Sequence, residues 1–172
     1  MMSATSLGMV NQKLAYARAV LAQLDGLPEG SASERLQRQA LLDAGAFHLM
    51  CAYSHYLREL GENYALTQVA GIHNESDLHK ALMAQGKSPA EVRELQELRR
   101  QPASWLTQLH ASYAACWQFP EKPTAHQDAA RIQAVDLEAV AAPLPVTAER
   151  LQTAYRALNE LIVRQRESTT EW

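Results

Sequence analysis

Apolar residues recur at steps of three and four along most of the chain, which is the period of a helix with one buried face. The clearest case runs from about Ser6 to Leu24, and Gly26 and Pro28 follow it as helix-ending residues. The repeat predicts a buried face made of Leu7, Val10, Leu14, Ala17, Leu21 and Leu24.

The next helix is predicted from Ser31 to about Glu62. Ser31 and Glu34 have the spacing of a capping box, in which each side chain binds a backbone amide of the other. Only Gly45 interrupts the pattern, so this helix would extend for about 45 Å at about 1.5 Å per residue. We expect it to be the central element of the fold.

Two shorter amphipathic helices are predicted next, and together they would form a helical hairpin. The first follows Asn74 and ends near Gly86, and the second follows Ser88, with Pro89 in its first helical position.

Two further helices complete the pattern. One starts at Pro102 and ends before Pro120, and the last begins at Thr147. The first of them is expected to face the core with Trp105, Leu109, Tyr113 and either Cys116 or Trp117.

These elements predict an all-α single domain over residues 1–172. Short connections make neighbouring helices antiparallel, so four of them would form a four-helix bundle with the helical hairpin inserted. An irregular segment bracketed by prolines, residues 120–146, precedes the last helix.

Composition narrows the function classes. The chain has 172 residues, a formal charge of -3 and a pI near 6.1, which argues against a polyanionic partner such as nucleic acid. No run approaches the ~20 apolar residues of a membrane span, and the N-terminus lacks a basic stretch followed by an apolar block. We therefore expect a cytoplasmic protein that binds no membrane.

One stripe of the second helix carries the candidate chemistry: His48, Cys51, His55, Arg58 and Glu62. His110, on a later helix, is the facing residue that could complete a site with this stripe. His55 with an adjacent glutamate could serve acid–base chemistry, and Arg58 could bind an anion. The alternative interpretation is a polar edge of the helical core with hydrogen-bonded histidines.

No metal site and no cofactor are expected. His48 and His55 lie two helical turns apart, about 10.5 Å along the axis, whereas two nitrogens on one zinc ion are about 3.4 Å apart. Cys51 and Cys116 are too few for a four-cysteine zinc site, and their apolar settings predict buried reduced thiols.

Four phrases of the chain resemble a family of short, mostly gammaproteobacterial proteins of unknown function: NQKLAYARAVLAQL, FHLMCAYSHYLRELGENY, RELQELRRQPASWLTQL and IVRQRESTTEW. The resemblance covers nearly the whole chain and implies a small, cytoplasmic, bacterial helical protein. Because no activity is assigned to that family, it implies no functional residues.

The sequence thus favours a non-catalytic helical binding or adaptor protein, because amphipathic helices are abundant and no catalytic constellation is complete. A protein partner or self-association is expected, with Trp172 as a candidate contact residue that could also pack back on the bundle. The alternative is a small-ligand sensor or enzyme with a polar pocket between helices two and four, which would use the stripe and His110.

Overall fold

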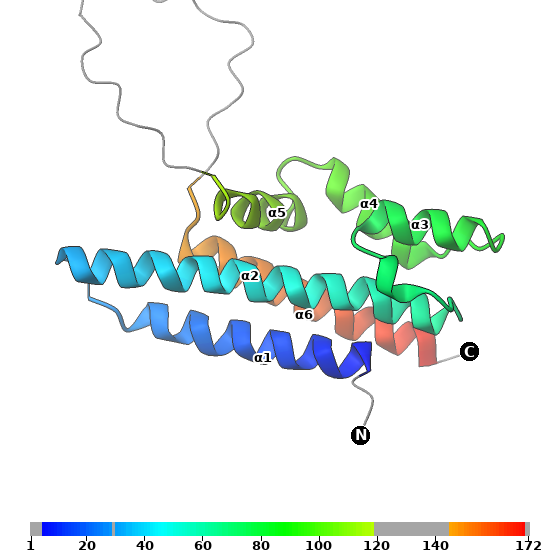
Figure 1. Ribbon diagram of the computed structural model, residues 1–172, viewed down its shortest axis with the longest axis horizontal. Coiled ribbons are helices and arrows are strands. Elements are labelled where there is room, and N and C mark those ends of the chain that lie inside the picture. Colours follow the sequence, from blue (N-terminus) through cyan, green and yellow to red (C-terminus); the bar gives the residue numbers. More distant parts are fainter. Residues whose placement is uncertain (1–4, 29, 119–144, 171–172) are drawn as a thin grey trace, which may run out of the picture.

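The computed structural model describes residues 5–28, 30–118 and 145–170. This part of the chain is all-helical, which confirms the predicted fold class, and it also contains a short 3-10 turn (Figure 1). In chain order the elements are α1 (Ser6–Asp25), α2 (Ala32–Asn63), η1 (Val69–Gly71), α3 (Glu75–Met83), α4 (Ala90–Arg100), α5 (Trp105–Ala115) and α6 (Ala148–Thr170).

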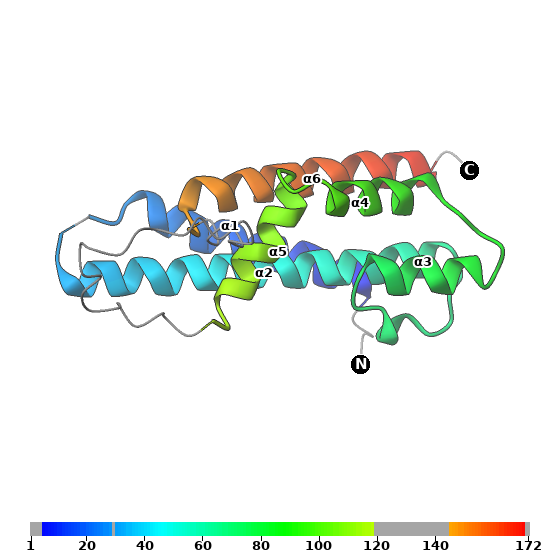
Figure 2. The same ribbon diagram turned by 90° about the horizontal axis from the view of Figure 1, so that it is seen from above.

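The three long helices α1, α2 and α6 contact one another and form the body of the molecule. The short helices α3, α4 and α5 lie on one side of α2, opposite α1 (Figure 1). Seen from above, α5 begins beside α6 and crosses α2 obliquely as it runs away from α6 (Figure 2). α3 and α4 form the expected hairpin, since they contact each other and reach α2 and α5 respectively.

Local side-chain bonds fix where the helices begin. The capping box at α2 is confirmed, because the Ser31 amide donates to Glu34 at 2.7 Å and the Glu34 amide donates to the Ser31 hydroxyl at 3.2 Å. The helix expected from Pro102 begins three residues later, because Ser104 is its capping residue and accepts from the Thr107 amide.

The core is made of aliphatic side chains from all the α-helices and of two tyrosines of α2, Tyr53 and Tyr56. The predicted buried face of α1 is correct except at its first position, where Leu7 is 46% exposed. Ser6 is buried instead, and its hydroxyl donates to Glu62 Oε1 at 2.6 Å. A cross-helix hydrogen bond therefore sets the rotation of the first turn of α1.

The end of α5 also differs from the prediction. Leu109 is buried, but Cys116 is exposed and Trp117 is 72% exposed. The helix ends at Ala115, so its period no longer places the following side chains against the core. Cys51 is half-buried, so neither thiol is fully buried as expected.

Polar contacts attach α6 to the rest of the bundle. Arg166 donates from Nε and Nη2 to the two carboxylate oxygens of Glu59, at 2.7 and 2.8 Å. The Tyr56 hydroxyl donates to Gln165 at 2.6 Å, and Gln165 donates to Glu94 of α4 at 2.9 Å. These bonds, of which the one between Tyr56 and Gln165 is buried, join α2, α4 and α6 at one level of the bundle.

Two expectations fall outside the described residues: the structure of nearly all of the proline-bracketed segment and the position of Trp172. Among the described helices, none has the length and apolar character that crossing a membrane would require.

Candidate functional site

The structure brings three residues of the α2 stripe together beside Lys13 of α1. Burial lowers the pKa of His48 and of His55, and the positive charge of Lys13 adds to the effect at both. Burial raises the pKa of the Cys51 thiol, against the opposing effect of Lys13. At neutral pH this group therefore consists of neutral imidazoles and a protonated thiol, which is a weak nucleophile.

The other two stripe residues make contacts that hold the fold together. Arg58 donates from Nε to the backbone oxygen of Ile72 at 3.3 Å, and Glu62 accepts the bond from Ser6. Both side chains thus bind neighbouring segments of the same chain.

His110 lies elsewhere, on the side of α2 that faces α3 and α5. Its ring packs edge-on against Tyr53, with 5.9 Å between ring centroids. At about 100° per residue, Tyr53 lies about 140° around α2 from His48 and about 160° from His55. His110 is therefore not brought together with the stripe.

His110 belongs instead to a polar cluster centred on Glu75, which the sequence pattern did not reveal. Glu75 Oε1 accepts from the Tyr53 hydroxyl at 2.5 Å and lies 3.5 Å from His110 Nε2 and 3.7 Å from Arg99 Nε. Burial alone would raise the pKa of the Glu75 carboxyl, but the contact with His110 and the hydrogen bond from Tyr53 outweigh it and lower this pKa.

The proton between Tyr53 and Glu75 stays on the tyrosine. Burial and the Glu75 charge raise the Tyr53 pKa well above its usual value, while the Glu75 pKa is lowered. Such a pair is a poor proton shuttle, because the two pKa values lie far apart. The cluster serves to fasten the α3–α4 hairpin to α2 and α5.

A surface of aromatic rings crosses three helices, α1, α2 and α5. Adjacent ring centroids lie 5.4 to 6.4 Å apart, which is the usual range for packed aromatic pairs. We call this surface the aromatic strip, and it consists in order of Tyr16 (α1), His48 and Phe47 (α2), and Tyr113 and Trp117 (at α5).

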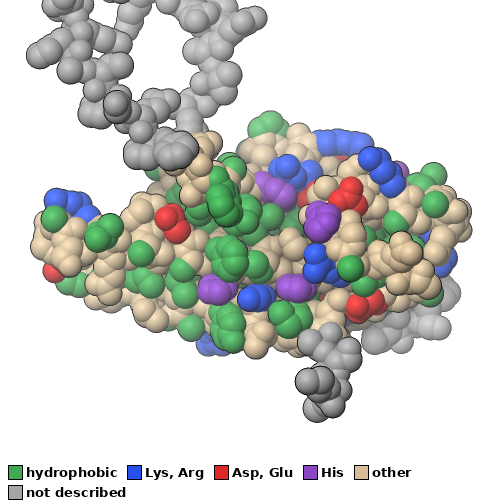
Figure 3. Space-filling model, in the orientation of Figure 1, with side chains coloured by type: hydrophobic (Ala, Val, Ile, Leu, Met, Phe, Trp, Pro, Cys, Tyr) green, Lys and Arg blue, Asp and Glu red, His purple; other side chains and the backbone are tan. Residues whose placement is uncertain are grey.

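The aromatic strip is open to solvent although it is apolar. Trp117 is 72%, Tyr16 45% and Phe47 44% exposed. Figure 3 shows hydrophobic side chains gathered in a band from α5 over α2 to α1, with histidine at its edge. The sequence places these rings on different helices, so only the packing of α1, α2 and α5 reveals that they adjoin.

A cleft of about 480 Å³ opens at the α5 end of the strip. Its lining is mostly apolar and carries a single carboxylate, that of Asp43. The residues that line the cleft are Asp43, Ala44, Phe47, His48, Tyr113, Cys116 and Trp117. Asp43 Oδ1 accepts from the neutral amide of Gln39 at 2.8 Å, so this bond leaves the negative charge uncompensated.

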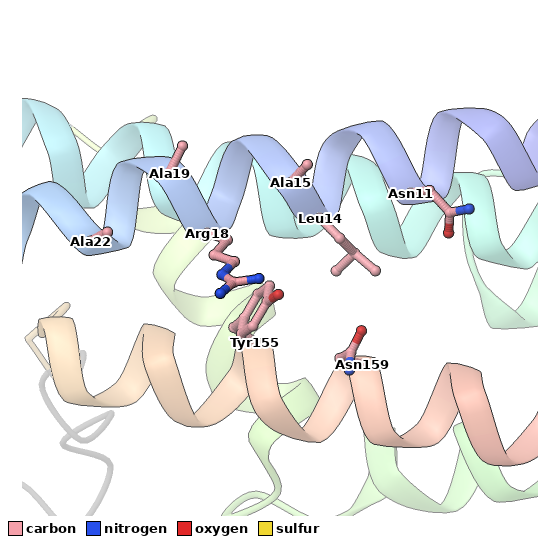
Figure 4. A pocket seen from close by; sticks show the side chains of 8 residues that line it. All are labelled: Asn11, Leu14, Ala15, Arg18, Ala19, Ala22, Tyr155 and Asn159. Atoms are coloured by element: carbon pink, nitrogen blue, oxygen red, sulfur yellow. The ribbon is translucent and has the colours of Figure 1, made fainter.

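A second hollow, of about 500 Å³, lies between α1 and α6. Figure 4 shows Arg18 of α1 directed toward the ring of Tyr155 on α6, with Asn159 beside it. Three of the six α1 residues that line the hollow are alanines. The hollow is shallow, its lining combines apolar side chains with Asn11, Arg18 and Asn159, and it contains none of the residues of the α2 stripe.

Metal chemistry gains no support from the described residues. Within residues 5–28, 30–118 and 145–170, no group of three or more His, Cys, Asp or Glu side chains could hold an ion.

Comparison with known proteins assigns no activity. No curated protein and no solved structure matches the chain. A family model described as a family of unknown function matches residues 1–172, which agrees with the resemblance noted above. That the family occurs mostly in gammaproteobacteria stays a prediction. The chain therefore belongs to the family of unknown function DUF6586.

Proposed function

We propose that this protein is a non-catalytic binding protein that uses the aromatic strip to bind another polypeptide. The observation that supports the proposal is the exposure of Trp117, Phe47 and Tyr16 on one continuous surface. Large exposed apolar patches are costly in water and mark interaction sites. Tryptophan and tyrosine are also the residues that most often dominate binding energy at protein interfaces.

The chemistry of the buried polar groups supports the same view. The side chains of the Glu75 cluster and of the pair formed by Glu59 and Arg166 bind one another across neighbouring helices, so they hold the fold together. The half-exposed group at His48, Cys51 and His55 is held in its uncharged forms by burial. None of these groups provides an activated nucleophile beside a matched base.

Site-specific photo-crosslinking in the cells that make the protein tests this function. A photoreactive phenylalanine analogue would replace Phe47 in one variant and Trp117 in another. The matched control carries the analogue at Leu36, which is 74% exposed on α2 but lies outside the strip. We expect defined crosslinked protein bands from the two strip positions and none from Leu36. Equal or absent crosslinking at all three positions would refute the proposal.

A small-ligand protein is the second candidate, and the hollow between α1 and α6 favours it. Arg18 and Tyr155 there combine a guanidinium with an aromatic face, which suits a planar anion. Native mass spectrometry of the protein purified from its own cells tests this candidate. A retained mass that disappears on Arg18→Ala would support it, and an unliganded mass would count against it.

A further inference from the structure

The aromatic strip has opposite charges at its two ends. At the α1 end, Lys13 Nζ lies 5.6 Å from the centroid of the Tyr16 ring. At the α5 end, Asp43 lines the cleft together with Trp117. A surface with rings in the middle and opposite charges at its ends can match a copy of itself that is turned around.

The spacing along α2 fits such an arrangement. Lys13 is close enough to Cys51 to affect its pKa, and Asp43 precedes Cys51 by eight residues, about 12 Å of helix. Phe47 stands halfway between these two positions. A two-fold axis through the strip near Phe47 would therefore bring Lys13 of each copy to the level of Asp43 of the other.

We propose that this protein forms a symmetric homodimer in which the aromatic strips of two copies pack antiparallel, with Lys13 of each copy facing Asp43 of the other. The proposal rests on the function proposed above, since it names a second copy as the polypeptide that the strip binds. Two-fold dimers are the commonest homo-oligomers, and their interfaces use the same patch on both subunits.

The exposed rings supply a large part of the area that such an interface needs. At about 200 Å² for each aromatic side chain, the exposed parts of Trp117, Tyr16 and Phe47 amount to about 300 Å² per copy. The smallest stable interfaces bury about 600 Å² per partner. Side chains that border the strip, such as Ala44 and Lys13, would have to provide the remainder.

Trp117 would be the main anchor of the dimer. It is the most exposed ring of the strip, and it stands at the acidic end. In the antiparallel arrangement it would lie against the Tyr16 end of the other copy, within reach of the Lys13 ammonium. A cation over an indole ring is the most favourable cation–π pair.

The charges allow a test of whether Lys13 of one copy faces Asp43 of the other. In Lys13→Glu, two acidic groups would meet at each end of the dimer, and in Asp43→Lys, two basic groups would meet. Either substitution should weaken the dimer about tenfold in Kd. An equimolar mixture of the two variants should form a heterodimer. At one end of it the two introduced side chains, of opposite charge, would face each other, and at the other end the native Asp43 would face the native Lys13.

Sedimentation velocity of the full chain over a wide range of concentration measures these equilibria, and circular dichroism reports whether each variant is folded. We expect a concentration-dependent dimer in the wild type, a monomer for Trp117→Glu, and an unchanged dimer for the control Leu36→Glu. The mixture of charge variants should recover the wild-type association, even if Trp117→Glu were to fold poorly.

Three results would overturn the dimer. They are a monomeric wild type at every concentration, a dimer that survives Trp117→Glu in a folded protein, and a mixture no tighter than the single charge variants. A monomer that still crosslinks another protein through Phe47 or Trp117 would leave the proposed binding function intact.

Discussion

Replacing Arg166 by methionine should destabilise the protein far more than the same change at Arg164, two residues earlier on α6. Arg166 makes a bidentate pair with Glu59, a carboxylate that is only 3% exposed. Its loss would leave a buried charge without its principal partner, which typically costs 3–5 kcal/mol. We expect about 3 kcal/mol, the lower end, because the Arg166 side chain is 27% exposed and water can enter.

Arg164 is the matched control because it also binds a glutamate, Glu94, but its side chain is 61% exposed. Arg164→Met should cost less than about 1 kcal/mol, as exposed ion pairs do. Urea denaturation followed by circular dichroism measures both losses. A loss of about 3 kcal/mol should also lower Tm by about 6–12 °C in a domain of this size.

A double variant shows whether the loss in Arg166→Met comes from the unpaired Glu59 charge. Glu59→Leu together with Arg166→Met removes both charges and should lie within about 1 kcal/mol of the wild type, because no ion is left uncompensated. The reasoning is refuted if Arg166→Met costs no more than Arg164→Met, or if the double variant is less stable than Arg166→Met alone.

Three further changes test the pH dependence, the core and the helix caps. Because burial lowers the pKa of His48 and His55 below the ordinary 6.5, the unfolded chain binds more protons below that pH. The unfolding free energy should therefore fall as the pH drops through and below 6.5, and His48→Gln with His55→Gln should flatten this decline in urea titrations. Leu57→Ala, at a fully buried position, should cost about 3 kcal/mol in urea, against less than about 0.5 for Leu36→Ala. Ser31→Ala removes the capping bond of α2 and should cost about 1 kcal/mol in thermal unfolding.

Each of these expectations has a result that would contradict it. An unchanged pH profile in the double histidine variant would show that other groups cause the decline. Equal losses of unfolding free energy in Leu57→Ala and Leu36→Ala would mean that Leu57 does not pack in the core. An unchanged Tm in Ser31→Ala would mean that the first turn of α2 frays in solution.

The helices can be predicted because their signals are local. The capping box of Ser31 and Glu34 lies within one helical turn, and the apolar period of α1 and α2 repeats over many residues. The rotation of the first turn of α1 cannot be predicted, because it depends on the bond from Ser6 to Glu62, which is 56 residues away.

The sites are harder to predict than the helices for a similar reason. His48, Cys51 and His55 share one helix, so their spacing alone places them on one face. Residue type alone groups His110 with them, whereas its position beside Glu75 follows from how α5 crosses the bundle. The aromatic strip likewise depends on α1 meeting α2 at His48 and on α5 meeting α2 at Phe47, which no pattern within one helix can show.

The place of α6 in the chain bears on how the protein is made by the ribosome. The partners that α6 supplies come late: Arg166 follows Glu59 by 107 residues, and Gln165 follows Tyr56 by 109. At about 5–20 residues per second, the stretch from Glu59 to Arg166 takes about 5 to 20 seconds to translate. During that time the nascent chain would present an unpaired carboxylate and a bare helical face on α2, so folding can be completed only after translation has passed α6.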